Sequence, residues 1–236
     1  PSYPGTTQNT GNAQATPISY NFGQQNDFLY TPPAGFEAIQ TQNLPAATIA
    51  NGRDHFGVVT YAGNNDQQRE ITGLRFTPDF VWIKQRDGES THSLQDTVRG
   101  AGANSLRSDT NNLAGAGAAA NGFIDRFDGN GFRLNRGTAP GQRVNANSSD
   151  YVAWCWRAGG AAVANNDGSI ASQVSANTDA GFSIVTYTGT DTAGATIGHG
   201  LSQLPECIFV KNRDESADRS WAVYHVGIDD TAPEDF

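Results

Sequence analysis

The fold is decided by the stretch Phe56-Gly57-Val58-Val59-Thr60-Tyr61-Ala62-Gly63, which occurs twice in the chain with conservative changes. The second copy is Phe182-Ser183-Ile184-Val185-Thr186-Tyr187-Thr188-Gly189, 126 residues further along. A run of β-branched and aromatic residues that is closed by glycine is typical of a β-strand and its stop. Each copy therefore predicts a strand, and the duplication predicts an internal repeat.

The match continues beyond this first strand, with a one-residue insertion in the second copy. The matched pairs are Ile71 with Ile197, Gly73-Leu74 with Gly200-Leu201, Pro78 with Pro205, Ser93 with Ser220 and Leu94 with Trp221. The run from Phe80 to Asp87 matches the run from Cys207 to Asp214, with Lys, Arg and Asp identical. Proline cannot donate to a strand ladder, so it fits the start of the second strand in each unit. The continuous apolar run from Phe80 to Ile83 predicts a strand covered on both faces, as in a sandwich.

The first unit also contains a predicted hairpin and a closing strand. Two apolar runs, Phe123 to Phe127 and Phe132 to Asn135, flank an Asp-Gly-Asn-Gly loop, which is a strong hairpin signal. The unit closes with Tyr151-Val152-Ala153-Trp154-Cys155-Trp156-Arg157, whose two alternating sides are both apolar. The stretch from Asp109 to Asn121 is expected to be a loop that crosses the sandwich, because each glycine costs a helix ~1 kcal/mol relative to alanine.

The amino-acid composition also favours a fold built from β-strands. Hydrophobic residues make up 37% of the chain, and Gly, Asn, Thr, Ser and Asp, which favour turns, replace the usual helix formers. We therefore predict an all-β fold of tandem β-sandwich repeats, jelly-roll or lectin-like, with long loops. The expected parts are residues 1–50, the end of another β domain plus a linker; 54–158, the first repeat unit; and 170–236, an incomplete second unit. Because Met is absent and the chain opens with Pro1-Ser2-Tyr3, we expect a fragment of a longer protein.

The charge balance argues against two classes of partner. The net charge is −9 and the 15 basic residues are scattered singly, whereas nucleic-acid binding needs clustered Lys and Arg. The uncharged stretch from Asn111 to Gly122 consists mainly of Ala, Gly and Asn and is too short and too polar to span a membrane. A signal peptide is not visible either. We expect neither nucleic acid nor a membrane as a partner.

The two cysteines, Cys155 and Cys207, lie in apolar strand-like runs, away from any CxxC motif or histidine pair. This setting argues against a zinc site and predicts buried free thiols, with a disulfide between the two as the alternative. We do not expect a disulfide framework to hold the chain together.

Signals for catalysis are weak. The histidines have no HExxH spacing and are expected to be exposed loop residues; they are His55, His92, His199 and His225. A GxSxG nucleophile elbow is absent. Asp87 and Asp214 occupy equivalent repeat positions beside an arginine, which favours a structural turn or ion pair over a catalytic role. A catalytic pair of carboxylates, as in glycosidases, stays an open alternative because Asp and Glu are plentiful. The chain is predicted not to be an enzyme and to use no cofactor.

Two binding hypotheses rest on particular side chains. Asp125, Asp128 and Asn130 could supply oxygen ligands to Ca²⁺, but the EF-hand loop pattern is missing, so no metal site is predicted. The four tryptophans could stack on sugar rings, but all lie in dense apolar runs, which predicts core positions. They are Trp82, Trp154, Trp156 and Trp221. If the chain binds a glycan, we expect the binding site in the polar loops 88–92 or 191–199 and not at the tryptophans.

Two family resemblances are carried by these segments. Asn21-Phe22-Gly23-Gln24 and Tyr30-Thr31-Pro32-Pro33-Ala34-Gly35-Phe36 resemble the C-terminal end of a SPRY domain, a β-sandwich interaction module. Most of that domain is missing, so its binding loops correspond to no residue of this chain. The repeated block resembles an uncharacterised domain found in tandem, often after a SPRY-like domain, in tail-fibre-like and other structural proteins of marine bacteriophages. The segments that carry this second resemblance are Pro78 to Asp87, Asp128 to Phe132 and Tyr151 to Gly160.

The second resemblance implies a virion role without defining a site. The expected function is a bacteriophage virion structural protein, tail-fibre-like, that builds a shaft or contacts the host surface. The expected partners are other virion proteins and further copies of the chain, with a trimer favoured, and the expected location is the extracellular particle. Two alternatives stay open: a lectin-like module that binds host surface polysaccharide, and a decoration or fibre protein attached to the capsid. We assign no catalytic, cofactor or metal residue, and the glycan- or receptor-binding residues stay undefined.

Overall fold

The computed structural model describes residues 47–214 and 220–228, together with residues 31 and 33–36 and two short strands nearer the N-terminus. Contacts divide the chain into two units, Pro1–Ala50 and Asn51–Phe236. In the first unit, β1 (Thr7–Gln8) pairs antiparallel with β2 (Thr16–Pro17). Of the two SPRY-like segments, the first lies outside the described residues and the second is described only in part.

The second unit is all-β, which confirms the predicted fold class. Its strands are β3 (Phe56–Ala62), β4 (Arg69–Thr72), β5 (Phe80–Gln85), β6 (Ser93–Asp96), β7 (Phe123–Asp128), β8 (Gly131–Asn135), β9 (Asp150–Trp156), β10 (Val163–Asn165), β11 (Ser172–Asn177), β12 (Phe182–Tyr187), β13 (Cys207–Val210) and β14 (Ala222–His225). In the part of the chain that is described, helical structure is limited to the 3-10 turn η2 (Gly52–Asp54) and the short helix α1 (Ala118–Asn121). The described residues contain no helix long and apolar enough to cross a membrane.

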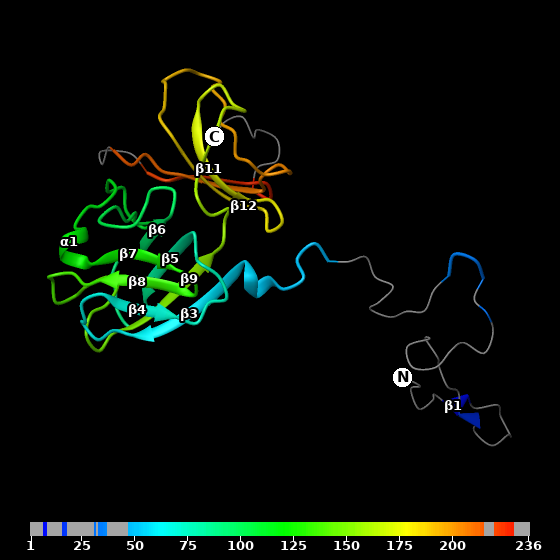
Figure 1. Ribbon diagram of the computed structural model, residues 1–236, viewed down its shortest axis with the longest axis horizontal. Coiled ribbons are helices and arrows are strands. Elements are labelled where there is room, and N and C mark those ends of the chain that lie inside the picture. The colour runs from blue at the N-terminus through cyan, green and yellow to red at the C-terminus, as the bar shows by residue number, and fades with distance from the viewer. Residues whose placement is uncertain are drawn as a thin grey trace. The chain divides into compact units, whose positions relative to one another are not determined.

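The first repeat is a sandwich of two antiparallel sheets (Figure 1). One sheet has the strand order β3-β9-β5-β6 and the other has the order β4-β8-β7. β9 closes the unit in sequence but lies in the middle of its sheet, because it pairs with β3 on one side and with β5 on the other. The last strand of the repeat therefore holds its first strands together.

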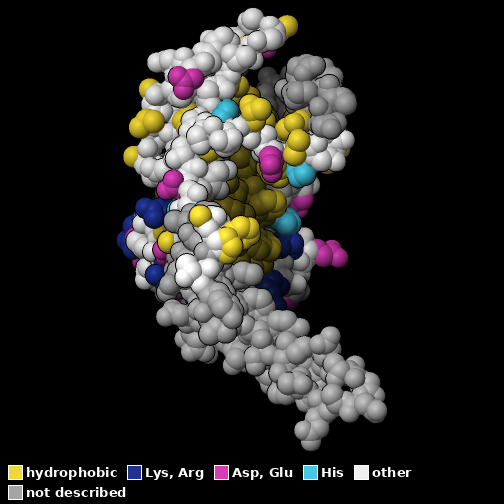
Figure 2. All heavy atoms as spheres, turned by 90° about the vertical axis from the view of Figure 1, so that its right-hand side faces the viewer, with side chains coloured by type: hydrophobic (Ala, Val, Ile, Leu, Met, Phe, Trp, Pro, Cys, Tyr) yellow, Lys and Arg dark blue, Asp and Glu magenta, His cyan; other side chains and the backbone are white. Residues whose placement is uncertain are grey.

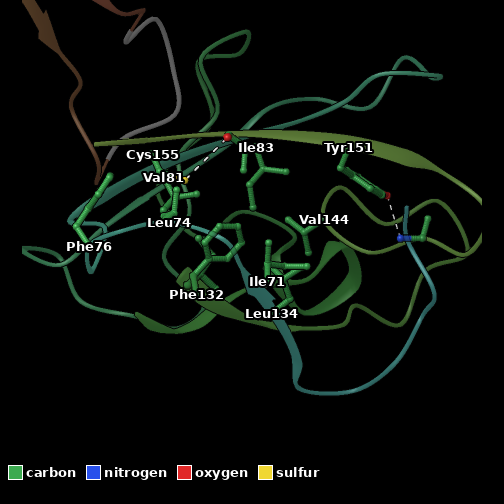
Figure 3. Packing of buried hydrophobic residues seen from close by; sticks show 13 residues of the cluster. Ile71, Leu74, Phe76, Val81, Ile83, Phe132, Leu134, Val144, Tyr151 and Cys155 are labelled. Carbon is green, nitrogen blue, oxygen red and sulfur yellow. Dashed lines mark hydrogen bonds between the residues drawn. The ribbon is translucent and has the colours of Figure 1, made fainter. Parts of the chain in front are cut away.

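The core lies between these two sheets. Figure 3 shows Val81 and Ile83 of β5 facing the side chains of Phe132 and Leu134 of β8, and all four are fully buried. The whole cluster is Ile71, Leu74, Phe76, Val81, Ile83, Ile124, Phe132, Leu134, Val144, Ala146, Tyr151, Ala153 and Cys155. Each large apolar side chain removed from water stabilises the fold by roughly 1.5–3 kcal/mol. This cluster is therefore the main source of stability in the first repeat.

The predicted hairpin is formed by β7 and β8. A register shift between Ile124 and Arg126 leaves Asp125 as a bulge in β7, and such a bulge increases the local twist of the strand. Gly131 opens β8 where β4 comes closest, and a Cβ atom there would lie 1.9 Å from the carbonyl oxygen of Ile71. The loop glycine is therefore required by the neighbouring strand as well as by the turn.

The second repeat forms two smaller sheets in the described residues. One has the strand order β10-β11-β12, and the other is the antiparallel pair β13-β14. β12 and β13 are the counterparts of β3 and β5 in the first repeat. β10 lies in the stretch of small residues that follows Trp156, and it pairs with β11.

The pair β13-β14 corrects one part of the repeat alignment. A backbone bond follows the second strand of each pair: Thr97 N–H donates to Asp79 O and Val226 N–H donates to Glu206 O, both over 2.9 Å. The acceptors are 127 residues apart in sequence, but the donors are 129 residues apart. Two further residues are therefore inserted before β14, so Leu94 corresponds to Val223. The expected match of Leu94 with Trp221 was wrong because short sequence similarity does not define strand register.

Candidate binding surface

The outer face of the sheet β3-β9-β5-β6 carries two rows of apolar and aromatic side chains. One row runs across three strands through Val58, Trp154 and Trp82, and the next runs through Phe56, Trp156 and Phe80. Directly opposed residues of antiparallel strands point to the same side of the sheet, so each row is a continuous line of side chains. We call these six residues the aromatic face.

The row of Val58, Trp154 and Trp82 is the more open one. Val58 is 51% exposed, and both tryptophans are half-buried. The two indole rings meet edge to face, with centroids 6.3 Å apart and an angle of 76° between their planes. This arrangement is favoured for aromatic pairs and fixes both rings. A surface that is already rigid loses little side-chain entropy when a ligand binds to it.

Trp82 is fixed further by His92. Its indole N–H donates to Nδ1 of His92 over 2.6 Å, and the ring centroids are 5.6 Å apart. Because an accepting Nδ1 carries no proton, this contact requires the neutral imidazole. Burial lowers the pKa of His92, and Lys84 lowers it further, while Asp109 acts in the opposite direction. The lowered pKa favours the neutral form of His92, which is the form that accepts the hydrogen bond from Trp82.

In the row of Phe56, Trp156 and Phe80, the last two residues pack against the second repeat. Phe182, the first residue of β12, stacks on Trp156 with a centroid distance of 6.0 Å and an angle of 18°. Its ring also lies 6.1 Å from that of Phe80. Phe182 is the repeat counterpart of Phe56. The aromatic face therefore joins the two repeats at one row and stays open at the other.

A polar groove of about 730 Å³ lies next to the row of Phe56, Trp156 and Phe80, where the two repeats meet. His55 and Asn177 line it, and Nδ1 of His55 is 2.9 Å from the side-chain nitrogen of Asn177. Arg75 lines it too and pairs with Asp54 over 2.8 Å. The groove has charged and polar walls of both signs, so it suits a polar ligand and not an apolar one.

Figure 2 shows hydrophobic side chains gathered in a hollow on one side of the described residues, with histidine side chains near its rim. Some of the large exposed hydrophobic residues of the chain belong to the aromatic face, and others belong to β13 and β14. Contiguous apolar surface of this kind marks interaction sites on soluble proteins. We therefore treat the aromatic face as the candidate binding surface.

The expectation that the tryptophans fill the core was wrong. All four are half-buried, and the indole N–H of Trp221 donates to the carbonyl oxygen of Arg107 over 2.8 Å. The inner positions of β9 are instead Tyr151, Ala153 and Cys155. The polar loops 88–92 and 191–199 contain both exposed and half-buried residues, and His92 connects the first of them to the aromatic face.

The carboxylates considered for calcium are held by arginines. Arg133 donates to both oxygens of Asp125 over 2.8 and 3.0 Å. Arg126 donates to Asp128 and to Glu70, each over 2.6 Å. The bond from Arg126 lowers the pKa of Asp128. The described residues hold no group of three or more His, Cys, Asp or Glu side chains placed so that they could bind a metal ion. These carboxylates form an ion-pair network in which arginines bind both oxygens of Asp125 and one oxygen of Asp128.

Each histidine has a separate hydrogen-bonding role. His55 and His92 contact Asn177 and Trp82 as described above. Nδ1 of His199 accepts the N–H of Leu201 over 3.1 Å, and Nδ1 of His225 accepts the N–H of Gly227 over 3.0 Å. His225 is exposed on a strand, whereas the other three are half-buried. The expectation of exposed loop histidines was therefore wrong in one respect for each: His55, His92 and His199 lie outside strands but are half-buried, and His225 is exposed but lies on a strand.

Asp87 and Asp214 lie in the bends after β5 and β13, as the turn hypothesis predicts. Asp87 accepts the side-chain N–H of Gln85 over 3.0 Å, and this bond lowers its pKa. Both cysteines are free. Cys155 is fully buried, and burial raises its pKa to about 12. Cys207 is exposed, so its expected burial was wrong.

A family model described as a domain of unknown function (DUF7483) matches residues 51–234. The chain belongs to this family. The DUF7483 match begins where the second structural unit begins, and it contains both repeats and the aromatic face. No curated protein and no solved structure matches the chain. The DUF7483 description names no activity, so function has to be argued from the geometry of these residues.

Proposed function

We propose that the chain is a structural protein of a bacteriophage virion, part of a tail-fibre-like appendage that builds a shaft or contacts the host surface. The sequence resemblance of the repeated block supports this role. The structural observation that supports it best is the packing of Phe182 on Trp156, which joins the start of one repeat to the end of the other. A shaft built from repeats needs such a fixed joint.

Hydrogen bonds reinforce this joint on both sides. The N–H of Gly159 donates to the hydroxyl of Ser175 over 2.9 Å, and that hydroxyl donates to the carbonyl oxygen of Gly160 over 2.8 Å. From the first repeat, the carboxylate of Asp79 accepts the N–H of Ala158 over 2.8 Å. The connection is therefore held by both repeats, unlike a flexible glycine linker. Rigid connections transmit force and position along an appendage.

The first test is the mass of the purified chain in solution, measured by light scattering after size-exclusion chromatography. A trimer is expected for a fibre protein, and a chain that stays monomeric at high concentration contradicts the proposal. The second test is labelling of intact particles with a specific antibody. Label at the tail supports a tail appendage, label on the head supports a capsid decoration instead, and unlabelled particles contradict both.

Glycan binding is a second candidate function, and the open row of the aromatic face favours it. Trp154 and Trp82 present fixed, half-buried rings of the kind that stack on sugars. The experiment is a glycan array of bacterial and algal polysaccharides, followed by titration of any hit against Trp154→Ala. Loss of binding in this variant is expected. The control is Val163→Ala, a 64% exposed residue of β10. An array without hits contradicts this candidate.

A further inference from the structure

Arg107 and Arg143 meet at one carbonyl group just before α1. The Nη2 of Arg143 donates to the carbonyl oxygen of Ala116 over 3.0 Å, and the Nη2 of Arg107 donates to the same oxygen. Arg143 is only 3% exposed, and Arg107 is half-buried. Two positive charges are therefore held close together at a place where water screens their repulsion poorly.

The described residues do not neutralise these two charges. In that part of the chain neither arginine forms an ion pair with a carboxylate, whereas the buried side chain of Arg99 pairs with Asp96. Burial, followed by the charge of Arg107, lowers the pKa of Arg143 to about 10, and Asp109 acts in the opposite direction. The pair is therefore short of a negatively charged partner.

Two donors of the pair also lack an acceptor. Nε of Arg107 and Nη1 of Arg143 are buried, and within the described residues neither donates a hydrogen bond. A buried donor without an acceptor destabilises a fold, and more so when the group is charged. A bound anion would reduce this cost, because it offsets the positive charge that both groups carry.

Gly117 leaves a space beside both guanidinium groups. A Cβ atom on this glycine would lie 3.1 Å from Nη2 of Arg107, 3.4 Å from Nη2 of Arg143 and 3.0 Å from Nδ2 of Asn121. The backbone of Gly117 has a φ of 67°, a conformation that residues with a side chain rarely adopt. Gly117 is also exposed. Three side-chain nitrogens therefore converge on a space that opens to solvent.

All three nitrogens have a further hydrogen for an acceptor. A guanidinium Nη and an amide nitrogen each carry two hydrogens. Within the described residues, each arginine Nη2 uses one of them on Ala116, and Nδ2 of Asn121 uses one on the carbonyl oxygen of Gly117 over 2.8 Å. An oxyanion offers several acceptor oxygens and a negative charge, so it matches both these donors and the two guanidinium groups.

We propose that Arg107, Arg143 and Asn121 form a binding site for a sulfate or phosphate group beside Gly117. The two arginines supply positive charge, and Asn121 supplies a neutral donor. The group can be a free ion or part of a larger molecule, since the space opens to solvent. The site shares no residue with the aromatic face, and the inference does not depend on a virion role.

The first experiment measures urea unfolding of the full chain by tryptophan fluorescence, over a series of sodium sulfate concentrations at constant ionic strength. An anion that binds only the folded chain stabilises it by mass action, and the effect follows the occupancy of the site. At about nine times the dissociation constant, the unfolding equilibrium constant is expected to be about tenfold lower. Exclusion of sulfate from protein surfaces also stabilises proteins in general, so a matched variant has to separate the two effects.

Asn121→Asp places a carboxylate at the site and keeps the size of the side chain. Without sulfate, this variant is expected to be more stable than the parent chain, and it should lose the sulfate response of the site. The control is Asn147→Asp, which adds the same charge at an exposed position and should keep the response. An equal response in all three chains reflects the general effect of sulfate and overturns the proposal, as does a parent chain without any response.

The second experiment locates the ion by crystallography of the parent chain in selenate, which has the shape of sulfate and a strong anomalous signal. A peak within about 4 Å of Nη2 of both Arg107 and Arg143 supports the proposal, and its absence from that place overturns it. A peak there without the specific sulfate response in solution means an adventitious ion only, and it also overturns the proposal.

The source of the group is tested by repeating the unfolding titration with glucose 6-sulfate, and with glucose as its control. Tighter binding of glucose 6-sulfate than of sulfate supports a group on a larger ligand, whereas equal or weaker binding supports the free ion. A response to glucose that equals the response to glucose 6-sulfate shows that the oxyanion is not recognised, and it overturns the proposal.

Discussion

The carboxylate of Asp79 accepts the backbone N–H of Ala158 over 2.8 Å and so ties the residue before β5 to the segment that follows β9. Its other oxygen accepts the hydroxyl of Thr97 over 3.0 Å. Asp79 is only 4% exposed, so these donors replace the water that an ionised carboxylate would otherwise bind. This one side chain connects β5, β6 and β9 at one end of their sheet, where the chain leads on to the second repeat.

Replacing Asp79 with alanine is expected to lower the free energy of unfolding by about 3 kcal/mol, because several buried donors lose a charged acceptor. The measurement is urea unfolding followed by tryptophan fluorescence. Asp179→Ala is the control, since Asp179 is exposed and should change stability by less than about 0.5 kcal/mol. Equal effects of the two substitutions would contradict the role of Asp79.

The two repeats are expected to respond differently to the same substitution on corresponding strands. Ile83 is 0% exposed in the core, so Ile83→Ala should cost about 2–5 kcal/mol through lost burial and the cavity left behind. Ile208 is 39% exposed, so Ile208→Ala should cost less than about 1 kcal/mol in the chain alone. Urea midpoints of the two variants measure the difference. A large cost at Ile208 would mean that the edge of β13 is already covered.

The stability of the chain is expected to fall on acidification because of His92. Its folded pKa lies below that of an ordinary histidine, chiefly through burial. Between those two pKa values the unfolded chain binds more protons than the folded one, so unfolding becomes easier as pH falls from about 6.5. The loss is complete below the folded pKa. Unfolding free energies at about pH 7.5 and about pH 5 measure it.

Replacing His92 with asparagine should reduce this loss, since the amide oxygen can still accept the indole N–H of Trp82 but does not titrate. The control is His225→Asn, which alters an exposed histidine on β14 and should leave the acid loss in place. If both variants keep the full loss, His92 is not its source.

The two thiols are expected to differ sharply in reactivity. Cys155 is fully buried with a pKa raised to about 12, and Cys207 is exposed. Because the thiolate is the reacting form and must be accessible, an aromatic disulfide reagent should label one thiol in the native chain and the second only after unfolding. Cys207→Ser should abolish the native labelling. Two labelled thiols in the native state would contradict the buried position of Cys155.

The strands themselves could largely be predicted from the sequence, since each depends on a short local pattern. The run from Phe56 to Ala62 and the hairpin around Asp128 to Gly131 carry β-branched, aromatic and turn residues at positions that only a strand or a tight turn satisfies. The candidate surface could not be predicted in the same way. Both alternating sides of β9 are apolar, so the pattern is equally compatible with tryptophans inside or outside.

Residues that act through distant partners were also missed. The position of Asp79 recurs in the repeat, but no sequence pattern marks Asp79 as important. Its role depends on Ala158, which is 79 positions away in the chain. The exposure of Cys207 likewise depends on how β13 is paired and packed, and not on its own neighbours in sequence. Such properties arise from pairing across the sheet and leave no local signal.

By itself the sequence determined that this chain forms β-strands in a repeated order, because strand formation follows from nearest neighbours and turn residues. Only the tertiary structure decided which side of β9 faces the core and where β14 pairs. Those outcomes depend on how sheets pack and on register between segments far apart in sequence. The aromatic face is therefore a property of the folded chain.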